Sequence, residues 1–143
     1  MGVNGKVRVY FKELTLSTKT QYELIDITYE VEKAVRDSGI SNGLCIIHAP
    51  HATAAIIANE NEAGLIQDII RSIKELYPRN AGWKHDIIDD NAAAHLGSAM
   101  IGSTRIFPVK DGRLVRGTWQ NIFLVEMDGP RPYRRVVIEV IGE

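Results

Sequence analysis

Apolar and polar positions alternate at the start of this chain and then change to a helical period. Residues 7–12 alternate in type, which predicts a strand with one apolar face, and residues 22–25 favour a short second strand. Apolar residues then recur every three or four positions, with Asp26 or Thr28 available as a cap and Gly39 as a stop. This change of period predicts an amphipathic helix after the two strands.

The middle of the chain predicts a core strand followed by a longer helix. Residues 44–47 form a short apolar run, which indicates a buried strand, and Ile56 and Ile57 continue in a partner strand. One apolar stripe runs along residues 62–76, so we expect a helix that ends before Pro78.

The stretch between this helix and the last third combines a loop with a short helix. Residues 79–90 have no period and predict an irregular loop over a site. Residues 92–99 are rich in helix formers and predict a short helix that begins near Asn91.

The last third predicts a meander of antiparallel strands. Asp111 and Gly112 are typical of a tight hairpin turn. The strands are expected over residues 104–109, 114–116, 118–127 and 134–141. Because strands and helices come in separate blocks, we predict one α+β domain over residues 1–143.

The composition is that of a globular protein and does not predict binding to a highly charged partner. Of its 143 residues 45% are hydrophobic and 24% charged, and the formal net charge is -1, so no general attraction to nucleic acid or to a membrane surface is expected. No apolar run reaches the length of a membrane span. Cys45 is the only cysteine, which excludes an intramolecular disulfide and predicts a buried, inert thiol and a cytoplasmic location.

Histidines supply the candidate chemistry. All four lie between positions 48 and 95, and imidazole binds transition metals or moves protons near neutral pH. His51, His85 and His95 are separated by 34 and 10 positions, which matches no compact zinc motif. Three hypotheses stay open: a zinc or similar divalent ion, a metal-free site, or three structural histidines. His48 precedes His51 by three positions, so a strand would turn the two side chains to opposite faces, and His48 is left out.

Other polar residues near the histidines have two interpretations each. Glu60 could cap the longer helix or act as a general base. Asn91 could cap the short helix or contact substrate, and the start of that helix is a candidate phosphate seat. Thr53 and Ser98 could add hydroxyl donors to such a site.

A series of motifs, in order over residues 7–141, resembles the YjbQ-like family, known as secondary thiamine-phosphate synthases. The motifs are Pro50-His51-Ala52-Thr53-Ala54, Asn59-Glu60-Asn61, Asn91, Ala94-His95, Gly102, Pro108, Gly112, Gly117-Thr118-Trp119-Gln120 and Asp128-Gly129-Pro130-Arg131. The resemblance implies an antiparallel β-sandwich-like core with two main helices and one short helix, assembled as a homotrimer. The polar residues shared with the family map onto His51, Asn59, Glu60, His85, Asn91, His95 and Gln120. Two positions depart from the family: Ala52 replaces a frequent Thr or Ser, and Asp90 a frequent Gly.

The resemblance implies a small histidine-centred enzyme that acts on a phosphorylated heterocyclic metabolite and condenses it with release of pyrophosphate. His51, His95 and Glu60 are the candidate catalytic residues, and His51, His85 and His95 the candidate ligands of zinc. Mg²⁺ on Asp89 and Asp90 would suit a diphosphate substrate better. The candidate substrate-binding residues are Asn59, Asn91, Thr53, Ser98, Thr118 and Gln120. A metal-dependent hydrolase and a non-catalytic phosphometabolite-binding module are the alternatives.

Overall fold

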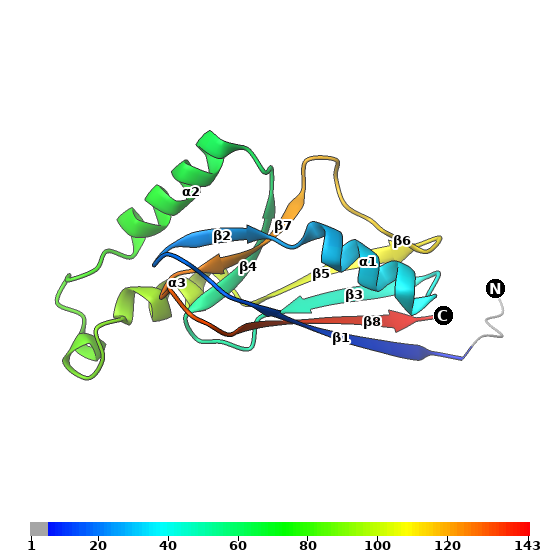
Figure 1. Cartoon of the computed structure of the whole chain (residues 1–143), viewed down its shortest axis with the longest axis horizontal. Helices are drawn as coiled ribbons and strands as arrows, with labels where there is room; N and C mark the ends of the chain where they lie inside the picture. The colour runs from blue at the N-terminus through cyan, green and yellow to red at the C-terminus, as the bar shows by residue number, and fades with distance from the viewer. Residues whose placement is uncertain (1–5) are drawn as a thin grey trace.

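The computed structural model describes residues 6–143, which form two antiparallel sheets, three α-helices and one 3₁₀ helix (Figure 1). Residues 1–5 of the domain predicted over 1–143 lie outside the described part. In chain order the elements are β1 (Arg8–Leu16), β2 (Glu23–Asp26), α1 (Thr28–Ser38), β3 (Gly43–His48), β4 (Ala54–Asn59), α2 (Ala63–Leu76), η1 (Lys84–Ile87), α3 (Ala92–Ile101), β5 (Thr104–Lys110), β6 (Arg113–Leu114), β7 (Asn121–Glu126) and β8 (Arg134–Gly142).

The strands separate into a larger and a smaller sheet. The larger has the order β1-β8-β3-β5-β6 and the smaller the order β2-β7-β4. The predicted meander of the last third is therefore wrong, because β7 pairs with β2 and β4 while β8 returns to pair with β1 and β3. The strand that contains Ile56 and Ile57 is confirmed as β4, but it lies in the other sheet from β3.

Two apolar clusters hold the layers together. The larger lies between the sheets and is closed by α1, and the smaller joins β7 and β4 to α2 and α3. β7 is buried along almost its whole length because one face points into each cluster. Cys45 is buried in the larger cluster as predicted, and burial raises the pKa of its thiol to about 12, which keeps the thiol protonated and inert.

Helix α1 follows its predicted limits. Val31, Ala34 and Val35 turn one buried face toward the sheets, and Gly39 ends the helix with a left-handed φ of 67°. The Asp26 carboxylate accepts hydrogen bonds from the backbone amide of Thr28 at 2.9 Å and from its hydroxyl at 2.6 Å. Asp26 thus caps the helix start, although it lies one residue before the formal N-cap.

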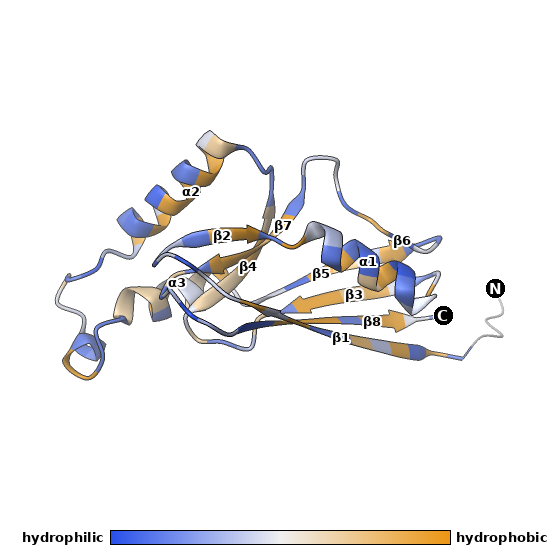
Figure 2. Cartoon of the chain, viewed as in Figure 1, coloured by the Kyte–Doolittle hydropathy of each residue, from blue (hydrophilic) through white to orange (hydrophobic). Residues whose placement is uncertain are grey.

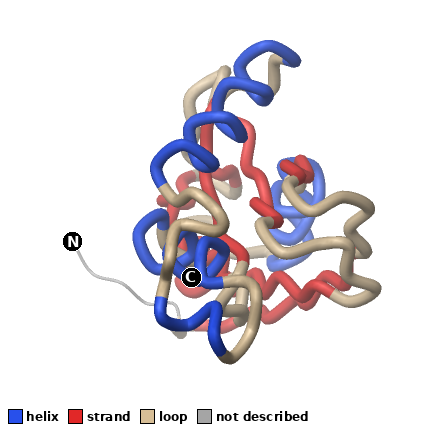
Figure 3. Tube along the Cα trace, turned by 90° about the vertical axis from the view of Figure 1, so that its left-hand side faces the viewer, coloured by secondary structure: helices blue, strands red, loops and turns tan. Residues whose placement is uncertain are grey.

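Helix α2 lies at one edge of the molecule, with its apolar stripe only partly covered. Figure 2 shows this stripe along the helix, and Figure 3 shows α2, η1 and α3 together at the near end. Ile73 is its one buried residue within the described chain, whereas Leu65, Ile66, Ile69 and Ile70 are half-buried. None of the helices in residues 6–143 has the length and apolar character needed to cross a membrane.

The predicted hairpin turn is confirmed. Asp111 and Gly112 have φ angles of 52° and 74° and join β5 to β6. Two successive left-handed residues suit the twist of a two-residue hairpin, and Gly reaches this conformation without a steric cost.

Candidate functional site

Two of the candidate histidines meet at the end of the molecule formed by η1 and α3. The rings of His85 and His95 pack edge to face, with their centroids 4.6 Å apart and their planes at 71°. His85 is carried by η1, where an irregular loop was expected, and His95 lies in the first turns of α3. Gly97 of α3 leaves room for the Met127 side chain, because a Cβ at this position would lie 2.6 Å from the Met127 sulfur.

A chain of hydrogen bonds fixes the ring of His85. His85 Nε2 lies 3.1 Å from Asn91 Oδ1, and Asn91 Nδ2 donates to Asp128 Oδ2 at 2.9 Å. Asp128 in turn accepts from Arg131 at 2.7 Å and lies 3.9 Å from the Arg79 guanidinium. Because the carboxylate accepts, the Asn91 amide must turn its oxygen toward His85, so His85 Nε2 carries a proton and, in the neutral ring, Nδ1 keeps its lone pair.

The role predicted for Asn91 as a side-chain cap of α3 is wrong. Its side chain makes no cap hydrogen bond, and the Asp86 carboxylate instead accepts from the backbone amide of Ala92 at 2.9 Å. The start of α3 is therefore occupied by a carboxylate and lined by buried alanines. This end of the helix is thus not a phosphate-binding site in this conformation.

A shallow hollow of about 530 Å³ opens beside His95. Its lining residues are Ala52, His95, Leu96, Ser98, Ala99, Gly102 and Ser103. A hollow of this size accommodates a small metabolite, and the side chain of His95 lies in its wall.

His51 immediately precedes Ala52, which lines this hollow, but the ring of His51 is already engaged. Its Nε2 accepts a hydrogen bond from the backbone amide of Arg135 at 2.8 Å, so the neutral ring carries its proton on Nδ1. Burial, and then the nearby Arg134 guanidinium, lower the pKa of His51 below its usual 6.5. In this conformation His51 therefore presents a hydrogen-bond donor rather than a metal-binding lone pair.

The two predicted hydroxyl donors are both buried and engaged within the protein. Ser98 donates to the Ala54 carbonyl at 2.6 Å, and the Thr53 hydroxyl accepts from Arg134 at 2.9 Å. Arg134 also pairs with Glu126, which accepts from the Thr18 hydroxyl at 2.7 Å. Burial acts to raise the pKa of Glu126, but the hydrogen bonds from Arg134 and Thr18 outweigh it and lower that pKa overall.

The other candidate residues lie at the opposite end of β4. Asn59 ends this strand and Thr53 immediately precedes it, and six extended residues span about 20 Å. Asn59 Oδ1 accepts from the Glu60 amide at 2.8 Å, and Gln120 closes its own turn by accepting from Gly117 at 2.7 Å. Glu60 does not cap α2, because Glu62 accepts from the first free amides of that helix.

Polar residues that were not predicted as site residues accompany this second group. Asp26 Oδ2 accepts from the side-chain amides of Asn61 and Asn121, each at 2.8 Å. Burial works to raise the pKa of Asp26, yet the hydrogen bonds from Thr28, Asn121 and Asn61 lower it overall. Asp128 was likewise missed as a site residue, although it stands in one of the quoted motifs next to a strand that holds the buried, charged Glu126.

The three-histidine metal site is not assembled within one chain in this conformation. No three His, Cys, Asp or Glu side chains in residues 6–143 are grouped so that they could hold a metal ion. Asp89 and Asp90, the candidate Mg²⁺ ligands, are exposed. His48, which was left out of the site, points its Nδ1 to the Thr104 hydroxyl at 2.8 Å.

Comparisons with known proteins identify the family. The family model described as "UPF0047 protein YjbQ-like" matches residues 12–143. The chain belongs to the YjbQ-like family. A UPF0047 protein of Archaeoglobus fulgidus is 43% identical over 129 residues, which cover 90% of this chain and 99% of the relative. The YugU protein of Bacillus subtilis is 39% identical over 135 residues, covering 92% and 98%.

Solved structures confirm the α+β fold of the YjbQ-like family for this chain. A crystal structure from Sulfolobus solfataricus, described as a YbjQ-like protein of unknown function, has 55% identity and a TM-score of 0.96 and covers 96% of this chain and all of its own. A hypothetical protein of Aeropyrum pernix follows with 44% identity and a TM-score of 0.90, covering 93% and 98%. The two antiparallel sheets and three helices expected from the resemblance are therefore confirmed, while the names of these YjbQ-like relatives state no activity.

Proposed function

We propose that this YjbQ-like protein is an enzyme that acts on a small phosphorylated heterocycle at the His85–His95 pair. The observation that carries the proposal is the Asp128–Asn91–His85 chain of hydrogen bonds, which ends on a ring in contact with His95 beside an open hollow. Fixing an imidazole in one tautomer is what acid–base and metal-binding histidines require.

The reaction we propose is the condensation that forms thiamine phosphate. The thiazole nitrogen attacks the methylene carbon of a pyrimidine-methyl diphosphate, forming a C–N bond while the C–O bond to pyrophosphate breaks. A protonated His95 can donate its proton to the departing pyrophosphate and can then take up a new proton from solvent, while the hydrogen bond between His85 and Asn91 holds the neighbouring ring in place. Substrate-sized space exists next to His95, where Ser103 adds a polar group to the wall.

A divalent ion, with zinc as the first candidate, is a second proposal for the same pair. The free Nδ1 lone pair of His85 favours it, because a ligating histidine commonly donates its other N–H to a fixed acceptor. The donor set within residues 6–143 is incomplete, so further ligands must come from substrate, from water, or from the His51 of a neighbouring copy after its ring has released the Arg135 amide. Such an ion would supply Lewis acidity, and its metal-bound water would suit a hydrolase. Mg²⁺ on Asp89 and Asp90 remains a proposal for a diphosphate substrate.

We further propose that the protein assembles as a homotrimer. Ile87 and Ile88, which follow His85, are 88% and 83% exposed, and Met100 and Trp119 are about 70% exposed. The apolar stripe of α2 is also incompletely covered. These surfaces are unfavourable in water and suit contacts between copies.

A trimer would also account for the two separated groups of candidate residues. The histidine pair and the group around Asn59, Glu60 and Gln120 lie at opposite ends of β4. A head-to-tail contact joins two different surfaces of successive copies, so it can bring one end of a protomer to the other end of its neighbour. The substrate would then bind between copies, in a cytoplasmic enzyme.

Product analysis with purified, untagged protein tests the function. The protein is incubated with pyrimidine-methyl diphosphate, with and without thiazole phosphate, and the products are separated by chromatography. Formation of thiamine phosphate that depends on both substrates supports the condensation, whereas hydrolysis of either substrate alone supports the hydrolase. Saturable ligand binding without any turnover contradicts an enzyme and supports the binding module. Metal content is measured on the same preparation before and after chelation.

A further inference from the structure

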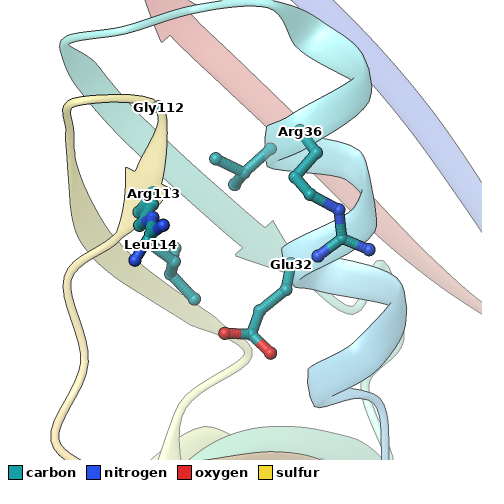
Figure 4. Close-up of a pocket in the computed structure, with 6 residues that line it drawn as sticks. Glu32, Arg36, Gly112, Arg113 and Leu114 are labelled. Carbon is teal, nitrogen blue, oxygen red and sulfur yellow. The ribbon is translucent and has the colours of Figure 1, made fainter.

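A second cavity lies between α1 and the hairpin that joins β5 to β6. It measures about 340 Å³ and is lined by Glu32, Val35, Arg36, Gly112, Arg113 and Leu114. Figure 4 shows Glu32 and Arg36 on the helix side of this cavity and Arg113 and Leu114 on the hairpin side. The volume lies within the range of small-molecule sites.

The floor of this cavity is apolar and is set by the helix period. Glu32, Val35 and Arg36 are separated by three and four positions and so share one face of α1. Val35 is 1% exposed and belongs to the larger core cluster, against which the half-buried Leu114 packs. The apolar floor is therefore part of the rigid core and does not have to be ordered by a ligand.

The charges around the cavity leave a surplus of positive charge. Glu32 is paired with Arg116 at 3.3 Å, which offsets its negative charge. Arg36 and Arg113 take part in none of the ion pairs among residues 6–143. The Arg36 guanidinium lies 5.9 Å from the centre of the Tyr29 ring, a contact that leaves its N–H groups free to bind an anion.

We propose that this cavity binds a small organic phosphate monoester. The phosphate would lie against Arg113, and the Arg36 side chain would turn to it from α1, because planar guanidinium groups match phosphate oxygens. The organic body would cover Val35 and Leu114. A phosphate monoester carries nearly two negative charges at neutral pH, which matches two free arginines better than a single carboxylate does. Glu32 would accept a hydrogen bond from a donor on the ligand and repel a second anionic group.

This site is separate from the histidine pair. β5 begins at Thr104, three residues after α3 ends, and runs to Lys110 at the hairpin, so seven extended residues lie between the two sites. That length corresponds to about 20 Å. Within one protomer, a ligand bound here does not contact the His85–His95 pair.

Backbone amide NMR of the ¹⁵N-labelled full chain, titrated with phenyl phosphate, tests the proposal. Saturable shifts of the amides of Val35, Gly112 and Arg113 are expected at millimolar concentrations or below. Arg36→Gln and Arg113→Gln should each weaken binding by about tenfold or more, because each removes a charge-assisted hydrogen bond. Arg71→Gln, in an exposed pair of α2, is the matched control and should leave the affinity unchanged.

Four results would overturn the proposal. Shifts that stay linear up to about 10 mM, or that are confined to η1 and α3, would show that the cavity binds no phosphate ester. Equal affinity for phenylacetate would contradict the preference for a doubly charged phosphate. Equal affinity for inorganic phosphate would show that Val35 and Leu114 contribute nothing to the site.

Discussion

His85 meets His95 edge to face, with 4.6 Å between the ring centroids, although ten positions separate them in the chain. The contact exists because η1 and α3 are joined by a turn at Asn91, whose side chain reaches back to His85 Nε2. Asn91 is 8% exposed, so its amide is held by the protein and not by solvent. The hydrogen bonds therefore fix the position of the His85 ring and the tautomer of its neutral form.

His95→Ala is expected to abolish turnover while the fold stays intact. Removing a proton-transfer group typically lowers a rate by at least about a hundredfold. Alanine suits a helix better than histidine, and the lost ring contact is worth about 0.5–1.5 kcal/mol, so the thermal midpoint should fall by only a few degrees. Turnover and midpoint are measured on the same preparations, with the exposed Lys84→Ala as control. Turnover near the wild-type level would make His95 structural.

Asp128→Asn is expected to allow both neutral tautomers of His85 instead of one. An amide at this position can offer either oxygen or NH₂ to Asn91, so Asn91 is no longer forced to turn its oxygen to His85. Long-range ¹⁵N NMR of the imidazoles should show protonated Nε2 in the wild type and a mixture of tautomers in the variant. Asp86→Asn, which alters the cap of α3, is the control and should keep the wild-type pattern. A mixture already present in the wild-type protein would refute the fixed tautomer of His85.

The sequence predicted the limits of helices and strands better than it predicted which strands pair with each other. The limits of α1 and the hairpin at Asp111 and Gly112 follow from local period and turn chemistry, which act within a few residues. The assignment of β4 and β7 to a separate sheet does not follow from the sequence. An alternating pattern predicts which face of a sheet a side chain lies on, but it does not predict which strand pairs with its own strand.

The sequence predicted which residues belong to the candidate site but did not predict the contacts that they make. The sequence singled out His85, His95 and Asn91, which the structure brings together. Helix capping was one of two interpretations for Asn91 and for Glu60, whereas Asp86 and Glu62 take these roles. Several acidic residues stand near each helix start, and only the backbone path decides which carboxylate reaches the free amides.

Glu126→Gln is expected to destabilise the protein by about 3–5 kcal/mol at neutral pH, because it leaves the buried Arg134 guanidinium without a countercharge. The lowered pKa of Glu126 implies that its stabilising contribution is complete above its ordinary value of 4.5 and is lost as the pH falls through the lower folded value. Urea unfolding at pH 7 and below pH 4 measures both effects. Glu75→Gln, in the exposed pair with Arg71, should cost at most about 0.5 kcal/mol. Equal losses in the two variants would contradict this role for Glu126.

His51→Gln is expected to remove a pH dependence of stability. Because burial lowers the pKa of His51 in the folded state, the unfolded chain binds more protons just below pH 6.5, and stability therefore rises with pH in that window. Glutamine can still accept from the Arg135 amide through its side-chain oxygen, so stability at pH 8 should change by less than about 1 kcal/mol. NMR titration should place the wild-type His51 below 6.5. An unchanged slope of unfolding free energy against pH in the variant would assign that slope to another group.

Mixed assemblies test whether the site lies between copies. If a homotrimer joins the histidine end of one protomer to the Glu60 end of the next, His95→Ala and Glu60→Ala proteins are each inactive for different reasons. After the two are unfolded together and refolded, about one quarter of the contacts should pair an intact His95 with an intact Glu60, and about one quarter of the wild-type turnover should return. Sedimentation checks that trimers have formed. A mixture of His95→Ala with His85→Ala is the matched control. Both changes lie at the same end of the protomer, so this mixture restores no complete contact. Recovery in neither mixture, despite trimers, would place the complete site within one protomer.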